Sequence, residues 1–181
     1  MPSPRRGLRL PGRGSVVRNT FFSRKPEYEL VPMTLRDCAE VSELHGERFA
    51  RRWNDGEFES LLLQPSTFGL VARQSNARIF RPPLAGFVLA REVAGEAEIL
   101  TIAVQERSAR MGFGWRLMLA AMREAHHRGG QSMFLEVDDG NRAAISLYGK
   151  LGFEVAGKRP AYYADAQGRK SAALVMKRDL G

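Results

Sequence analysis

The chain lacks the features of a disulfide-bonded or membrane-spanning protein. Cys38 is the only cysteine among 181 residues, so an intrachain disulfide is impossible and a reducing, cytoplasmic compartment is expected. No apolar run approaches the roughly 18 residues of a membrane-spanning helix, and no apolar stretch of a secretory signal follows the basic N-terminus. We therefore expect no membrane partner, and we expect Cys38 to be a small buried residue.

Acidic residues are absent from residues 1–26, which combine Pro, Gly, Arg and Ser without apolar periodicity. Such a segment is expected to be flexible, because it cannot bury enough apolar surface to offset its ordering entropy. Organelle transit peptides share this composition. The expected organisation is a basic flexible tail at residues 1–26, followed by one domain at residues 27–181.

The net charge of +8 would favour a polyanionic partner if it lay on the folded domain. Residues 1–30, however, carry seven basic and two acidic side chains, and so account for five of the eight net positive charges. The rest of the chain is only modestly basic. Direct binding of nucleic acid by the domain is therefore not expected.

The apolar pattern predicts an α/β domain. Strands at 99–104 and 132–137 alternate with a helix from about residue 117 and a helix at 141–151, over short connections. This order predicts that the two strands lie parallel. The other expected strands are 28–31, 68–72, 84–91, 153–158 and 172–177, and the other expected helices are 34–45 and 55–63.

Gly112 and Gly114 lie between a predicted strand and a predicted helix. Without β-carbons, this junction lets backbone N–H groups approach a phosphate at the positive end of the helix dipole. A lone Gly-x-Gly pair is also found in ordinary turns. The dinucleotide fingerprint needs a third glycine where this chain has Leu117, and no Gly-Lys-Ser/Thr phosphate loop is present, which argues against both nucleotide-binding classes.

Two blocks of sequence lie around and beyond these glycines. The first is Arg110–Trp115, RMGFGW, and the second is Leu135–Phe153, LEVDDGNRAAISLYGKLGF. Together they resemble the GNAT superfamily of acetyl-CoA-dependent N-acetyltransferases, and the second block is similar to its RimI-like members, which acetylate protein N-termini. The resemblance implies an α/β GNAT acyl-CoA N-acyltransferase fold, a mixed central sheet flanked by helices with splayed parallel strands.

The resemblance also implies where acetyl-CoA binds. One strand lends its backbone edge to the pantetheine arm, and the glycine segment holds the pyrophosphate. The family pattern prefers Gln or Arg where this chain has Ala109, which is expected to weaken cofactor binding without abolishing it, because backbone N–H groups make most contacts. Asn141 would also suit a plain helix cap. The implied cofactor-binding residues are Ile102, Ala103, Val104, Arg110, Met111, Gly112, Phe113, Gly114, Trp115 and Asn141.

Glu136 is a charged residue within the otherwise apolar strand Met133–Val137, whose other members all look buried. On its own it could be half of a structural ion pair or a general base. The resemblance makes Glu136 the base that deprotonates the attacking amine. It makes Tyr148 the general acid, because a phenol with an unperturbed pKa of about 10 stays protonated at neutral pH.

Aromatic residues are implied on the acceptor side. Trp53 follows Phe49 where the group often has an aromatic pair, and Tyr162 and Tyr163 match the segment that lines the acceptor peptide. Such aromatic pairs are more often packing residues. His126 and His127 are adjacent and lack the i, i+4 spacing of helical metal ligands. We therefore expect no metal.

The predicted function is transfer of the acetyl group of acetyl-CoA to a protein N-terminal α-amine, an alanine of a ribosomal protein in the RimI-like case. An α-amine, with a pKa of about 7.8, is easier to deprotonate than a lysine side chain, with a pKa of about 10.4. One alternative is acetylation of a small-molecule amine or a lysine side chain. Another is a non-catalytic acetyl-CoA-binding regulatory or RNA-associated module. The chain is expected to be a monomer or a weak dimer.

Overall fold

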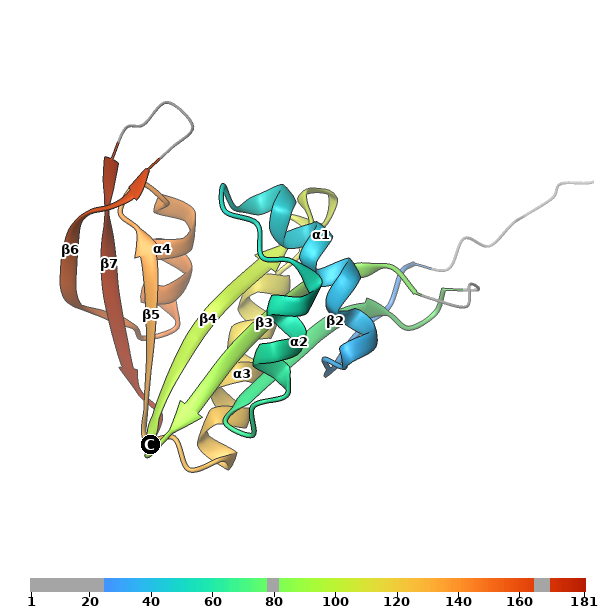
Figure 1. The fold of residues 1–181 in the computed structure, drawn as a ribbon, viewed down its shortest axis with the longest axis horizontal. Helices are drawn as coiled ribbons and strands as arrows, with labels where there is room; N and C mark the ends of the chain where they lie inside the picture. Colours follow the sequence, from blue (N-terminus) through green and yellow to red (C-terminus); the bar gives the residue numbers. More distant parts are fainter. Residues whose placement is uncertain (1–24, 78–81, 165–169) are drawn as a thin grey trace, which may run out of the picture.

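The computed structural model describes residues 25–77, 82–164 and 170–181, without the side chains of residues 161–164 and 170–171. Its strands form one mixed sheet in the order β1-β2-β3-β4-β5-β7-β6, with helices on both faces (Figure 1). The strands are β1 (Tyr28–Pro32), β2 (Thr67–Gln74), β3 (Leu84–Val93), β4 (Glu96–Val104), β5 (Ser132–Asp138), β6 (Glu154–Ala164) and β7 (Lys170–Asp179). The helices are α1 (Cys38–Arg48), α2 (Asp55–Leu62), α3 (Phe113–His127) and α4 (Arg142–Lys150), with short 3₁₀ turns at Leu35–Asp37 and Glu106–Ser108.

The predicted parallel pair is confirmed: β4 and β5 are parallel, and α3 connects them. All other neighbouring strands are antiparallel. Each predicted helix and strand of the domain is present, with ends shifted by a few residues. The helix expected at 34–45 begins as a 3₁₀ turn and continues to Arg48. Of the predicted tail, only Lys25 and Pro26 are among the described residues, so its flexibility stays a prediction.

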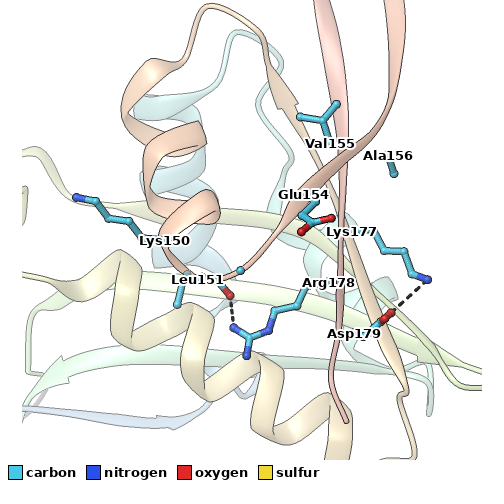
Figure 2. A pocket seen from close by; sticks show the side chains of 9 residues that line it. Lys150, Leu151, Glu154, Val155, Ala156, Lys177, Arg178 and Asp179 are labelled. Atoms are coloured by element: carbon cyan, nitrogen blue, oxygen red, sulfur yellow. Dashed lines mark hydrogen bonds and ion pairs between the residues drawn. The ribbon is translucent and has the colours of Figure 1, made fainter.

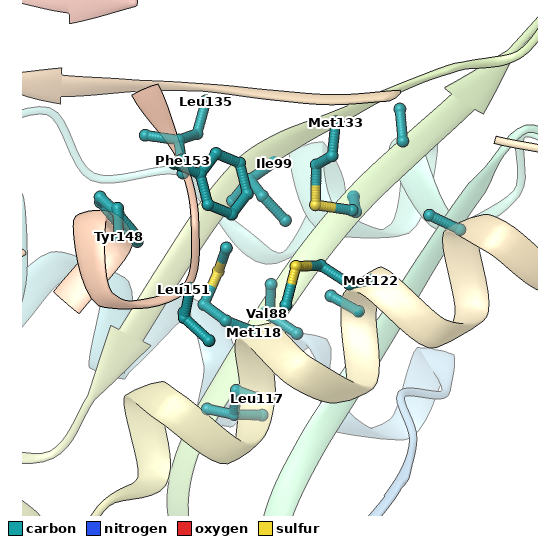
Figure 3. Close-up of a cluster of buried hydrophobic side chains, with 14 of the residues drawn as sticks. Val88, Ile99, Leu117, Met118, Met122, Met133, Leu135, Tyr148, Leu151 and Phe153 are labelled. Carbon is teal, nitrogen blue, oxygen red and sulfur yellow. The ribbon is translucent and has the colours of Figure 1, made fainter. Parts of the chain in front are cut away.

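Two apolar cores form, one on each face of the sheet. The larger core joins α3 and α4 to β4 and β5, with Leu117, Met118 and Met122 packed against Met133 and Leu135 (Figure 3). The apolar stripe read from the sequence of α3 is therefore its buried face.

The smaller core lies under α1 and α2, where Val41, Leu44 and Phe58 pack against Phe87 of β3. Cys38 belongs to this core and is only 1% exposed. Burial, together with nearby Glu59, raises the pKa of its thiol to about 11. The expectation of a small buried residue is confirmed.

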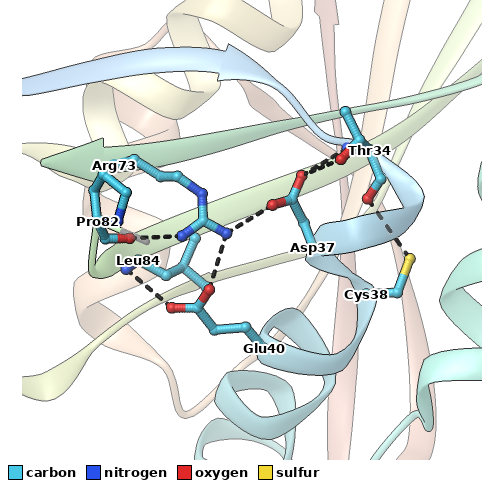
Figure 4. A network of polar contacts seen from close by, with 7 residues as sticks. All are labelled: Thr34, Asp37, Cys38, Glu40, Arg73, Pro82 and Leu84. Atoms are coloured by element: carbon cyan, nitrogen blue, oxygen red, sulfur yellow. Dashed lines mark hydrogen bonds and ion pairs between the residues drawn. The ribbon is translucent and has the colours of Figure 1, made fainter. Parts of the chain in front are cut away.

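A buried polar network joins the start of α1 to the sheet (Figure 4). Arg73 of β2 donates to Asp37 Oδ1 at 2.7 Å, to Glu40 Oε2 at 2.9 Å and to the Pro82 carbonyl at 2.8 Å. Asp37 Oδ2 accepts the Thr34 N–H at 2.7 Å, which caps the first turn. Burial alone would raise the pKa of Asp37, but the hydrogen bonds from Thr34 and Arg73 hold that pKa below its ordinary value.

Arg73→Met is expected to lower the free energy of unfolding by about 3 kcal/mol, because it removes the cation beside the buried Asp37 carboxylate and the partly buried Glu40 carboxylate. The exposed pair Arg91–Glu98 at 2.9 Å supplies the control, and Arg91→Met should cost less than about 1 kcal/mol. Urea unfolding measures both. The folded pKa of Asp37 is depressed, so its contribution is present above its unfolded pKa and lost as pH falls through the folded value. The Arg73→Met deficit should therefore shrink in acid, and a constant deficit would contradict this origin.

Across the described ranges, no helix combines the length and apolar character needed to cross a membrane.

Candidate active site

An opening between β4 and β5 results from the pairing of these strands. They pair only over Glu96–Ile99 and Ser132–Leu135. Beyond that point β4 stays with β3 as far as Val104, and β5 stays with β7 as far as Asp138. The inner edges of the two strands therefore lie free of each other over their last residues.

A bulge in β4 marks where the strands part. Ala90 and Leu89 of β3 face Ile99 and Thr101, so Leu100 is an extra residue. A bulge bends its strand and increases its twist, which directs the end of β4 away from β5. Ile102, Ala103 and Val104 follow the bulge, and their β5-facing backbone edge is unpaired in the described ladder. The predicted pantetheine strand thus has the free edge that it requires.

The N-terminus of α3 lies beside this opening and has the properties of an anion site. Gly112 is the N-cap and has a left-handed φ of +80°. No described side chain caps the first amides of α3, and its first turn holds no acidic residue. A β-carbon on Gly112 would meet nothing within 4 Å. The first amides of a helix have no acceptor within the helix, so they can bind an anion here.

Some of the other residues of the glycine segment are exposed around the proposed anion site, and others pack into the core. Arg110, with φ +63°, and Met111 and Trp115 are exposed around Gly112. A β-carbon on Gly114 would lie 3.2 Å from Leu147 Cδ2, so this glycine lets α4 pack closely on α3. Phe113 is 2% exposed, and its ring packs edge-on to Tyr28 with centroids 4.7 Å apart, so its implied cofactor contact stays a prediction that concerns its backbone. Only the Phe113 amide can face a ligand.

Asn141 forms the helix cap that its position suggested. Its Oδ1 accepts the Ala144 N–H at 3.1 Å at the start of α4. The side chain is exposed, and its amide NH₂ group is still a donor. A cofactor contact of Asn141 therefore stays a prediction.

Glu136 lies on β5 next to the point where the strands part. Its side chain is 24% exposed, and Oε1 lies 3.2 Å from Nη1 of Arg159 on β6. The expectation that its strand neighbours are all buried is wrong for Phe134, which is half-buried on the same face, because alternate residues of a strand share a face. Met133, Leu135 and Val137 are buried on the opposite face.

Tyr148 approaches from that opposite face. It lies on α4, is 6% exposed, and packs edge-on to Phe153 with ring centroids 6.1 Å apart. It belongs with Leu135 to the core on the α3 and α4 side (Figure 3). Glu136 and Tyr148 are thus on opposite faces of β5, one on each side of the sheet.

The segment between α1 and α2 is held by His45. The imidazole is 3% exposed, stacks on Phe49 and Trp53 with centroids 4.3 and 5.2 Å away, and accepts the Trp53 N–H through Nδ1 at 3.2 Å. Burial lowers the pKa of His45 to about 4, so the ring stays a neutral acceptor at neutral pH. Trp53 is half-buried in this stack, whereas Phe49 is 40% exposed.

Tyr162 and Tyr163 lie on β6 by their backbone. Their side chains are outside the described residues, so their acceptor-binding role stays a prediction.

A surface hollow lies over the middle of the sheet, and another lies at its β6–β7 edge. One, of about 680 Å³, contains Glu136 and Arg159 together with Phe134, Arg91 and Glu98. The other, of about 690 Å³, lies at the end of α4 between β6 and β7 and contains Lys150 and Arg178. Figure 2 shows Arg178 donating to the Leu151 carbonyl there. None of the predicted site residues lines this second hollow.

Fold and site together define an acetyltransferase class: a mixed sheet whose parallel strands part beside an open helix N-terminus. The chain belongs to the acetyltransferase (GNAT) family, whose model matches residues 38–153. The expected fold class is thereby confirmed.

Named relatives extend this result. The chain is similar to the [ribosomal protein bS18]-alanine N-acetyltransferase of Salmonella typhimurium, with 38% identity over 92 residues, 51% of this chain and 62% of that protein. The crystal structure of the ribosomal-protein-S18-alanine N-acetyltransferase from Escherichia coli has a TM-score of 0.76 and 26% identity, over 86% of this chain and 95% of that one. The fold also matches Arabidopsis thaliana NAA60 in complex with acetyl-CoA, with a TM-score of 0.76 and 17% identity, over 84% and 98%.

Two residues of the site were not found from the sequence. Arg159 lies in a strand of mixed composition, and only strand pairing places it beside Glu136. His45 belongs to no recognised motif. Its position shortly before Phe49, Trp53 and Phe58 could have indicated a buried aromatic cluster.

Proposed function

We propose that this protein transfers the acetyl group of acetyl-CoA to the N-terminal α-amine of a protein, an alanine of a ribosomal protein. The observation that supports this most is Glu136, a partly exposed carboxylate at the point where β4 and β5 part. The similarity to bS18-alanine N-acetyltransferases supports the same acceptor. The sequence match to the Salmonella relative covers 62% of its length, and the acceptor is therefore part of the proposal.

The described residues fit acetyl-CoA. The open space at Gly112 and the uncapped first turn of α3 suit a pyrophosphate. The free edge of Ile102–Val104 suits an extended amide-containing arm. Arg110, Met111 and Trp115 are exposed around the same turn. When bound, acetyl-CoA would supply an acetyl group activated as a thioester.

Glu136 and Tyr148 would handle the two protons of the reaction. Glu136 accepts a proton from the acceptor amine, directly or through one water, and such a base contributes about 10²–10⁴ in rate. Tyr148 donates a proton to the departing thiolate. The amine forms the new C–N bond as the C–S bond of the thioester breaks, so that CoA thiolate is the leaving group, and the two residues lie on opposite faces of β5.

The acceptor preference follows from acidity. An α-amine with a pKa of about 7.8 is easier to deprotonate than a lysine amine at about 10.4, by roughly 3.5 kcal/mol. A single carboxylate base suits the α-amine, whose deprotonation costs less free energy. Trp53 and the tyrosines of β6 are proposed to line the acceptor peptide. A cytoplasmic location is part of the proposal and rests on the single, buried Cys38.

The test is intact-mass analysis after incubation with acetyl-CoA and matched peptides. One peptide begins with a free alanine, and the other has a blocked α-amine and a free lysine side chain. The proposal expects a single acetyl group on the first peptide only. Acetylation of the blocked peptide alone would mean a lysine acetyltransferase, and binding of acetyl-CoA without transfer to any amine would favour a regulatory module.

A further inference from the structure

The carboxylate of Glu136 is paired with a cation from a strand that is not its neighbour. Arg159 Nη1 lies 3.2 Å from Glu136 Oε1, yet β7 separates β5 from β6. In the ladder, Glu136 faces Val175, which faces Gly157, and Asp138 faces Ala173, which faces Arg159. Arg159 therefore reaches diagonally across β7, from the row that contains Asp138 to the row that contains Glu136.

The residues between the two charged groups make this reach possible. Gly157 has no side chain, and Ala173 and Val175 are small, so an extended arginine can lie low over β7. A β-carbon at Gly157 would lie 3.9 Å from Val175 Cβ, which is ordinary contact, and no other atom of the described residues beyond its chain neighbours lies within 4 Å of it.

Other charged groups on this face have partners of their own. Arg91 pairs with Glu98 at 2.9 Å across from Phe134. Lys177 lies 5.7 Å from the Phe134 ring centroid and 3.3 Å from Asp179. Arg159 is the cation that the structure brings to the Glu136 carboxylate.

We infer that Arg159 is a positioning residue for Glu136: its guanidinium holds one carboxylate oxygen, so that the other can be presented to the acceptor amine. The inference rests on the proposed function, in which Glu136 is the base. A carboxylate has two oxygens that accept hydrogen bonds, so holding one does not prevent the other from taking a proton. The planar guanidinium fixes direction better than an ammonium point charge.

Arg159 also balances the charge at the opening. Glu136 alone would favour an acceptor that arrives as an ammonium ion, which must still lose its proton before attack. With Arg159 beside it the pair is neutral, and an amine is not penalised relative to its ammonium form. Arg159→Gln is therefore expected to lower kcat by about tenfold or more. This loss is part of the rate acceleration of about 10²–10⁴ that a well-placed base contributes.

The experiment compares Arg159→Gln, Arg159→Lys, Glu136→Gln and the double variant Arg159→Gln/Glu136→Gln. Steady-state kinetics with the alanine peptide gives kcat and both KM values. The matched control is Lys158→Gln. Lys158 is the next residue on β6, similarly exposed, and pairs with Asp139 rather than Glu136, at 3.0 Å.

We expect Arg159→Gln to lose kcat with little change in the KM for acetyl-CoA, Arg159→Lys to recover part of it, and Lys158→Gln to match the parent. In the Glu136→Gln background, Arg159→Gln should have no further effect, because its action passes through Glu136. Equal losses in both backgrounds, or no loss in the parent, would overturn the positioning role while leaving Glu136 as the base. A fully active Glu136→Gln variant would instead overturn the proposed base itself.

Discussion

Glu136→Gln is expected to lower kcat/KM for an N-terminal alanine peptide by about 10²–10⁴ at about pH 7, the contribution of a general base. Glutamine keeps the shape of the side chain on β5 but cannot accept the proton. The α-amine loses its proton unaided near a pKa of about 7.8. The deficit should therefore shrink as pH rises through that value.

The measurement is kcat/KM against pH for the parent and the variant. Tyr148→Phe is the contrasting variant, because it removes the donor for the thiolate and leaves the base intact. Its deficit should persist above about pH 7.8, since deprotonation of the amine does not help the thiolate leave. Parent-like rates for Glu136→Gln at about pH 7 would assign the base to another group.

The sequence predicted the central part of the fold well because several local signals agreed there. The stripe of Leu117, Met118 and Met122 has helical spacing, and Asn141 is a good N-cap; both features were found as expected. The parallel arrangement of β4 and β5 followed from the intervening helix. These are properties that neighbouring residues determine.

The sequence could not predict features that depend on how distant strands align. The bulge at Leu100 is visible only as a shift in register against β3. The contact between Glu136 and Arg159 joins residues 23 positions apart through the alignment of three strands. Strand alternation does predict that Phe134 and Leu135 point to opposite faces, so the expectation that the whole strand is buried did not follow from the sequence.

His45 shows a further limit of sequence reading. A histidine in a helix reads as a polar residue, but here it is buried between Phe49 and Trp53 and holds the Trp53 backbone. Ser42 holds the same segment by donating to the Trp53 carbonyl at 2.8 Å and accepting from Arg52 Nε at 3.2 Å. The shape of the segment between α1 and α2 is thus determined by polar residues on the buried face of α1, which an apolar pattern does not reveal.

The cofactor site makes an equally strong prediction at Gly112. Gly112→Asp is expected to raise the Kd for acetyl-CoA by about 100-fold or more, since bringing like charges together costs several kcal/mol and each 1.4 kcal/mol is about tenfold in affinity. The new carboxylate would lie at the open first turn of α3, where the pyrophosphate is proposed to bind.

Gly112→Asn separates the effect of charge from that of shape. Asparagine has nearly the same size as aspartate, and both tolerate the left-handed conformation that Gly112 adopts, at φ +80°, better than other side chains do. Isothermal calorimetry with acetyl-CoA, with thermal melting to verify the fold, should show a much smaller loss for Asn than for Asp. Equal losses would mean that the added side chain blocks the site and that its charge is irrelevant. Unchanged affinity in the Asp variant would place the pyrophosphate elsewhere, because an anion bound to the first amides of α3 could not be indifferent to a carboxylate at its N-cap.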